Sequence, residues 1–108
     1  MIRNDKVANN KMYAVIFKAE INELDEVYRD MASRMRELAC NEFGCIEFSS
    51  YTDGANELAI SYWADRESIK AWKNHPEHRQ AQALGKSRWY KSYQVQIVEV
   101  LSQYGSNI

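Results

Sequence analysis

The sequence contains few residues that interrupt regular structure, and it has no excess of charge of either sign. It has one proline and four glycines among 108 residues, so we expect most of the chain to form helices and strands. Its 14 lysines and arginines nearly balance 15 aspartates and glutamates, for a formal net charge of -1. Such a balance offers no electrostatic footprint for nucleic acid or for an anionic membrane, and we expect neither as a partner.

Long apolar runs are also lacking. No segment approaches the roughly 20 apolar residues that a transmembrane helix needs. The polar start of the chain, MIRNDKVANNKM, has none of the apolar core of a secretory signal. We therefore expect a cytoplasmic protein.

Candidate metal and redox motifs are weak. Cys40 and Cys45 lack C-x-x-C spacing, and two small buried thiols are a simpler interpretation than a disulfide or redox pair. His75 and His78 are three residues apart without a carboxylate pair on the same face, so no metal site is predicted.

The length suits one domain, which we place at residues 12–104 after a flexible tail over residues 1–11. Residues 12–20 alternate as a buried strand, with Tyr13, Val15 and Phe17 on one face and Met12, Ala14 and Ile16 on the other. Residues 22–39 have the spacing of an amphipathic helix that Asn22 could cap. Its apolar stripe begins at Leu24, and its polar face includes Ser33 and Arg36.

The second half of the chain adds three strands and a helical region. Residues 44–51 and 57–63 predict a hairpin with a turn at 52–54. Asp65 can cap a helix that Asn74-His75-Pro76 interrupts, after which a helical segment runs to about residue 88. Residues 90–101 predict a long last strand.

This order of elements is β-α-β-β-α-β, the ferredoxin-like pattern of an α+β fold with a four-stranded antiparallel sheet. Helices on one face of the sheet leave the other face bare, and the predicted strands supply aromatic and branched residues to either face. A monomer would expose an apolar patch, whereas two sheets packed face to face would close into a barrel. We therefore predict a homodimer, a dimeric α+β barrel.

A pocket wall is predicted near the last helical segment. His78, Gln82 and Gly85 fall on one helix face, with Trp72 and Trp89 on either side of it. Gly85 has no side chain to bury and so leaves room for a ligand. Core packing is the alternative for Trp63 and Trp72, and a solvated helix-end cation is the alternative for Arg88.

Three stretches, ISYWADRESIKAWKNHPEH, AQALGKSRWY and YQVQIVEVLSQY, resemble the antibiotic biosynthesis monooxygenase family of dimeric α+β barrels. The resemblance covers about residues 12–104. The family includes cofactor-free oxygenases of aromatic polyketides and haem-degrading enzymes. Against the haem-degrading members, Trp72 matches their tryptophan, while Phe17 and Gln82 stand where they have asparagine and the haem-ligating histidine. Against the cofactor-free oxygenases, Tyr62, Arg66 and Trp72 stand where they have asparagine, tryptophan and tyrosine.

The resemblance implies a monooxygenase that acts on a small aromatic, phenol- or quinol-like compound without a tightly held cofactor. His78 is the predicted catalytic residue, for acid–base or hydrogen-bonding work. The predicted substrate-binding residues are Trp63, Trp72, Gln82, Arg88, Trp89 and Tyr93. Two alternatives stay open: a non-catalytic small-molecule binding protein of the same fold, and a haem-binding or haem-degrading protein.

Overall fold

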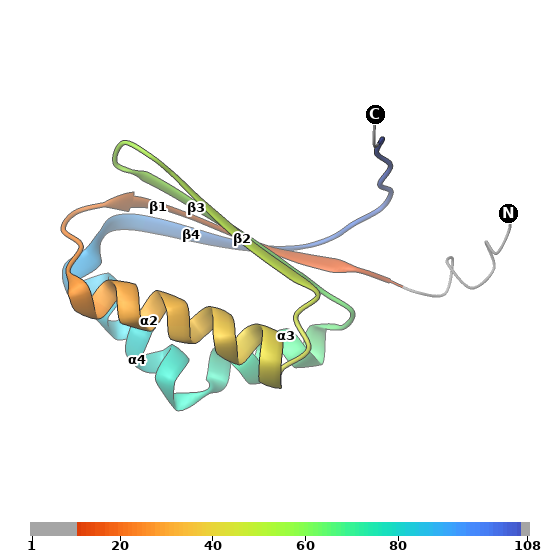
Figure 1. Cartoon of the computed structure of the whole chain (residues 1–108), viewed down its shortest axis with the longest axis horizontal. Helices are drawn as coiled ribbons and strands as arrows, with labels where there is room; N and C mark the ends of the chain where they lie inside the picture. The colour runs from red at the N-terminus through yellow and green to blue at the C-terminus, as the bar shows by residue number, and fades with distance from the viewer. Residues whose placement is uncertain (1–10, 107–108) are drawn as a thin grey trace, which may run out of the picture.

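The computed structural model describes residues 11–106 (Figure 1). Along the chain lie β1 (Tyr13–Ile21), α2 (Glu26–Glu37), β2 (Glu47–Asp53), β3 (Asn56–Trp63), α3 (Arg66–Asn74), α4 (Pro76–Leu84) and β4 (Tyr90–Glu99). Two of the helices end in a wide π-helical turn, α2 in η1 (Leu38–Glu42) and α4 in η2 (Gly85–Trp89). The predicted β-α-β-β-α-β order is confirmed, with the second helix split at the predicted break. Apart from residue 11, the predicted flexible tail lies outside the described residues.

The four strands form one antiparallel sheet in the order β2-β3-β1-β4. All three helices lie on one side of it (Figure 1). On that inner face Phe17 of β1 lies opposite Ala59 of β3 and Val95 of β4. This is the predicted ferredoxin-like α+β fold.

The opposite face of the sheet carries no helix within residues 11–106. Ala14 lies opposite Tyr62 there, Ile16 opposite Ile60, and Leu58 occupies the next outward position of β3. We call these five residues the uncovered face. These five residues are apolar or aromatic, as predicted, but the same side of the sheet also carries the polar Lys18 and Gln96.

The start of α2 differs from the prediction. Asp25, and not Asn22, caps the helix, because its carboxylate accepts a hydrogen bond from the Tyr28 amide at 2.8 Å. The side chain of Asn22 instead donates to the carbonyl of Arg88 at 3.1 Å. Leu24 therefore precedes the helix and is 37% exposed, so the apolar stripe does not begin there.

Asp65 caps α3, as predicted, and His75 caps α4. Asp65 accepts from the Ser68 amide at 2.7 Å at the start of α3. His75 Nδ1 accepts from the Glu77 amide at 3.1 Å at the start of α4, where Pro76 takes the first helical position.

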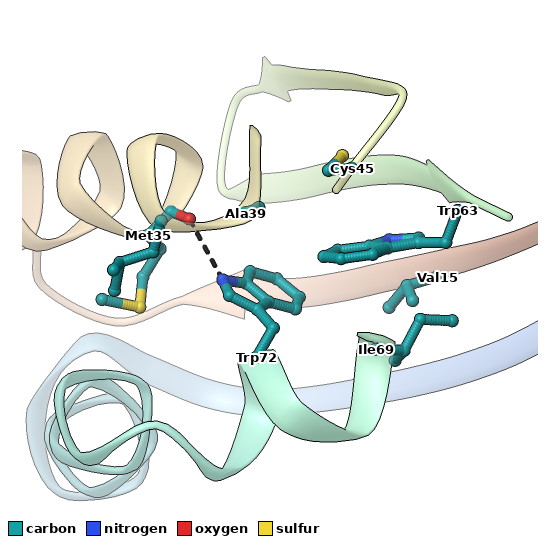
Figure 2. Packing of buried hydrophobic residues seen from close by; sticks show 8 residues of the cluster. Val15, Met35, Ala39, Cys45, Trp63, Ile69 and Trp72 are labelled. Carbon is teal, nitrogen blue, oxygen red and sulfur yellow. Dashed lines mark hydrogen bonds between the residues drawn. The ribbon is translucent and has the colours of Figure 1, made fainter. Parts of the chain in front are cut away.

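The core fills one part of the space between sheet and helices. Trp63, Leu38 and Ile69 are its largest fully buried side chains. Trp72 donates from its indole nitrogen to the Met35 carbonyl at 3.1 Å, which joins α3 to α2 (Figure 2).

The two cysteines have different environments. Cys45 is buried in the core, as predicted, but Cys40 is exposed, and both are free thiols. The prediction that Cys40 is buried is wrong. Cys40 lies in η1, where it and the residues directly after it face solvent.

Candidate functional site

A pocket of about 370 Å³ lies between the inner face of the sheet and the helices. Val15 and Phe17 of β1 line it on the sheet side, and Met31 and Met35 of α2 line it on the helix side. Trp63 fills the neighbouring core, Trp72 borders both the core and the pocket, and the small side chain of Ala59 leaves this part of the sheet open. A mostly apolar hollow with a few polar groups is the form that small-molecule sites take.

His78 supplies one polar group of the pocket. Its Nδ1 is buried and has no hydrogen-bond partner within residues 11–106. Its ring meets Trp72 edge to face, with centroids 4.3 Å apart and planes at 80°. Since nearly all buried polar atoms in proteins have partners, an unpaired one that borders a pocket marks a place for a ligand atom.

The charge state of His78 follows from its burial. Removal from water lowers the pKa of His78 to about 4, and the positive charge of Lys73 acts in the same direction. The imidazole is therefore neutral at pH 7. It can form one hydrogen bond through Nδ1, either as an acceptor or as a donor, depending on its tautomer.

Glu57 supplies a second polar group. Its Oε2 accepts a hydrogen bond from the Tyr28 hydroxyl at 2.7 Å, and its Oε1 accepts one from Thr52 at 3.1 Å. Burial and the hydrogen bond to Glu57 raise the pKa of Tyr28, and burial raises the pKa of Tyr90. Both phenols therefore stay protonated, and Glu57, Tyr28 and Tyr90 all line the pocket.

The space at Gly85 has a different use from the one predicted. A Cβ built on Gly85 would lie 3.1 Å from Cδ2 and Cε2 of Tyr90. The missing side chain thus makes room for the Tyr90 ring and not for a ligand. Tyr90 in turn packs against Phe17, with centroids 5.3 Å apart, and forms part of the pocket wall.

The structure brings five of the seven predicted site residues together around the pocket. They are Trp72, His78, Gln82, Trp89 and Tyr93. Their predicted roles in binding and catalysis stay predictions.

Trp63 and Arg88 lie outside the pocket lining. Trp63 is fully buried in the core, where its indole nitrogen donates to Ser61 at 2.9 Å. Arg88 forms an ion pair with Asp25 at 2.7 Å, which ties the end of η2 to the start of α2. These positions are the alternatives that the sequence left open: core packing for Trp63 and a helix-end cation for Arg88.

Sequence reasoning missed several residues at the pocket. Arg36, predicted on the solvent face of the helix, lines the pocket and donates to Ser50 at 3.0 Å. Arg36 follows Tyr28 by eight residues, which is about two helical turns, so the two residues lie near the same face of the helix. A wider definition of the inward-facing stripe of this helix would therefore have included Arg36. Glu57 shares its strand face with Ala59, which is the signal that could have placed it inward.

The family model for antibiotic biosynthesis monooxygenase matches residues 12–84 of the chain. A related protein, uncharacterized protein YqjZ of Bacillus subtilis, is 36% identical over 89 residues, which cover 82% of this chain and 78% of YqjZ. The chain belongs to the antibiotic biosynthesis monooxygenase family. Membership supports a monooxygenase or small-molecule-binding role.

Two further comparisons involve oxygenases. Jasmonate monooxygenase ABM of Pyricularia oryzae is 27% identical over 89% of this chain, which spans only 46% of that longer protein. The structure of SnoaB, a cofactor-independent oxygenase from Streptomyces nogalater, superposes with a TM-score of 0.73. At 7% identity over 88% of this chain and 98% of SnoaB, this likeness shows the shared fold.

Two further features are absent from residues 11–106. No helix among them combines the length and apolar character needed to cross a membrane. No group of three or more histidine, cysteine, aspartate or glutamate side chains gathers there as a metal site would require.

Proposed function

We propose that the protein is a monooxygenase for a small hydroxylated aromatic compound, which it binds in the pocket without a resident cofactor. The observation that carries this proposal is the buried Nδ1 of His78, which has no hydrogen-bond partner among residues 11–106 and borders a mostly apolar pocket. Family membership supports the oxygenase chemistry.

A phenolic hydroxyl suits His78 in either tautomer. It can donate to a bare Nδ1 or accept from a protonated one, whereas a carbonyl can only accept and an ammonium can only donate. The walls suit a flat ring, because Phe17 and Trp72 present aromatic surfaces and Val15 an aliphatic one.

The low pKa of His78 favours hydrogen bonding over proton abstraction as its role. An imidazole with a pKa of about 4 is a weak base toward a phenol at pH 7. The positive charge of Lys73 that disfavours a charged His78 would favour a substrate anion beside it. Molecular oxygen would then react with the electron-rich phenolate, and the substrate itself is the reductant. One oxygen atom enters the ring, which becomes a quinone, and the other leaves as water with the two hydrogens that the substrate loses.

Haem is the alternative cofactor, and the residue at the family's ligand position does not suit it. Gln82, which stands where haem-degrading relatives have their ligating histidine, lines the pocket but is a poor iron ligand. A titration with hemin should therefore give no saturable Soret shift. A stoichiometric shift that the substitution His78→Phe abolishes would replace our proposal with haem binding.

The test of the proposal is oxygen uptake with naphthols and hydroquinones as substrates. His78→Phe keeps a flat ring against Trp72 and removes Nδ1, so we expect kcat/KM to fall about a hundredfold. Gln80→Ala, an exposed change on the same helix, is the matched control and should leave uptake unchanged. Ligand binding without oxygen uptake would make the protein a non-catalytic binder, and no binding of any hydroxylated aromatic would refute the proposal.

We also propose that residues 12–104 form one domain of a cytoplasmic homodimer, in which the uncovered faces of two copies pack against each other. The apolar character of Ile16, Leu58 and Ile60 supports this arrangement. Two sheets joined in this way would form the barrel predicted from the sequence.

A further inference from the structure

We propose that Glu57 forms a second polar subsite, at the far end of the pocket from His78, and that it binds a second hydroxyl of the substrate. This inference rests on the proposed function and narrows its substrate class. The substrate would be an elongated aromatic diol, with a hydroxyl at each end of a fused ring.

The two polar groups lie at opposite ends of the pocket. Glu57 and Ser61 are four residues apart on the same face of β3, so their Cα atoms are about 13 Å apart. Ser61 lies opposite Phe48, and Trp72 packs on both Phe48 and His78, at centroid distances of 6.1 and 4.3 Å. His78 is therefore near the level of Ser61, and the pocket separates it from Glu57.

The bonding of Glu57 leaves room for a ligand. A carboxylate offers about four acceptor positions, and Tyr28 and Thr52 together occupy two of them, one on each oxygen. These two bonds fix the carboxylate in place. An ionised carboxylate only accepts hydrogen bonds, so its ligand must bring a donor such as a hydroxyl, and an ether or carbonyl oxygen will not serve.

The middle of the pocket is apolar and aromatic. The ring of Phe17 stacks against Tyr93 at 6.0 Å and packs against Tyr90 at 5.3 Å with a tilt of 59°, and the small Ala59 lies beside Phe17 on the sheet. Aromatic walls of this kind favour a planar aromatic guest. A planar molecule that reaches both His78 and Glu57 must carry its polar groups at opposite ends.

Titration calorimetry with three related ligands tests this subsite on the unmodified protein. 2-Naphthol carries one hydroxyl, 2,6-dihydroxynaphthalene carries a second at the far end, and 6-methoxy-2-naphthol keeps the second oxygen but not its proton. We expect the diol to bind about tenfold or more tighter than 2-naphthol, because its second hydroxyl donates to a charged acceptor. The methoxy compound should lose this gain.

Variants assign the gain to Glu57. Glu57→Gln removes the charge and should abolish most of the preference for the diol. Glu23→Gln, which neutralises an exposed carboxylate outside the pocket, should keep it. If Glu57→Gln does not fold, the methoxy comparison on the unmodified protein still decides.

Three results would overturn the subsite. One is a preference of only about twofold, which the two equivalent orientations of a symmetric diol produce on their own. The others are a methoxy compound that binds as tightly as the diol, and a preference that persists in Glu57→Gln. If 2-naphthol still binds and His78→Phe weakens it, the proposed function stands although the subsite fails. If none of the three ligands binds, both fail.

Discussion

Trp72 holds the His78 ring in place without offering it a hydrogen bond. The two rings meet edge to face at 4.3 Å, but the one donor of the indole is already engaged by the Met35 carbonyl at 3.1 Å. Trp72 thus belongs to the core and to the pocket at once. Packing fixes the position of His78 while its Nδ1 stays unpaired, which is the arrangement that a ligand-binding group requires.

The stability of the protein should depend on pH through His78. Its pKa is lowered from 6.5 to about 4 by folding, so between these values the unfolded chain binds a proton that the folded chain does not. The free energy of unfolding should therefore fall as the pH drops from about 6.5 to 4, by up to about 3 kcal/mol.

Urea denaturation at several pH values measures this dependence. Other groups titrate in the same range, so the quantity to compare is the difference between the unmodified protein and His78→Phe. The variant should lack the component that grows between pH 6.5 and 4. Parallel curves for the two proteins would contradict the burial of a neutral His78.

Gly85→Ala should change ligand binding more than stability. Gly85 has helical backbone angles, so alanine gains about 1 kcal/mol of helix propensity, which offsets the crowding of Tyr90 at 3.1 Å. The Tyr90 ring must move by a few tenths of an ångström, and we expect the affinity for aromatic ligands to fall severalfold. Calorimetry and thermal melting measure the two effects.

Two controls accompany this variant. Gly105→Ala, where an added Cβ meets nothing within 4 Å, should change neither quantity. In the background Tyr90→Leu the effect of Gly85→Ala on melting should shift toward stabilisation, because the crowded ring is gone. Additive effects of the two substitutions would show that the contact does not matter.

The two cysteines should differ in reactivity. Burial, with a further contribution from the neighbouring Cys40, raises the pKa of Cys45 from 9.0 to about 11. At a given pH below 9 this shift leaves Cys45 about a hundredfold less thiolate than an ordinary thiol. Iodoacetamide at pH 8 should thus label the exposed Cys40 first.

Mass spectrometry of the alkylated protein follows the order of labelling. Cys40→Ser should resist alkylation in its folded form and react with one equivalent in urea. Equal rates for the two cysteines in the folded protein would contradict the environment found for Cys45.

A charge on the uncovered face should separate a dimer into monomers. Ile16 and Ile60 are directly paired at the middle of that face. Ile60→Lys would place an ammonium group in a dry interface between two sheets, at a cost of several kcal/mol. Sedimentation should show a dimer for the unmodified protein and a monomer for the variant.

Lys86→Glu, which changes the charge by two units at an exposed position on the helix side, should leave the assembly unchanged. A monomer before any substitution would refute the homodimer, and a dimer that tolerates Ile60→Lys would place its interface elsewhere.

The helices and strands are easier to predict from the sequence than the site. Helices and strands depend mainly on residues close together in the sequence, whereas the site depends on contacts between residues far apart. Strand alternation such as that of Tyr13, Val15 and Phe17 is local and predicts the faces of β1 correctly. The cap of α2 was ambiguous, since Asn22 and Asp25 are both good capping residues. The choice depends on Arg88, whose carbonyl engages Asn22 from 66 residues away.

The polar groups of the pocket are harder to predict for the same reason. His78 stood out because a histidine between tryptophans is unusual at a helix face. Glu57 looks like an ordinary charged residue beside a hairpin turn; its strand face points it inward, and its contact with Tyr28, 29 residues earlier, holds it at the pocket. The sequence indicates the space at Gly85 correctly. The ring that fills this space belongs to Tyr90, which follows Gly85 by five residues across a π-helical turn.

The wide turn η2 allows this part of the chain to vary in length without turning the pocket residues. A π-helical turn accommodates one residue more than an α-helical turn, and each residue of an α-helix rotates the next side chain by about 100°. Deleting one residue between Gly85 and Trp89 would thus restore α-helical winding and leave Trp89 facing nearly the same way, toward the pocket. Homologous chains one residue shorter here can therefore keep the same pocket, and a gap at this turn does not by itself mark a change of specificity.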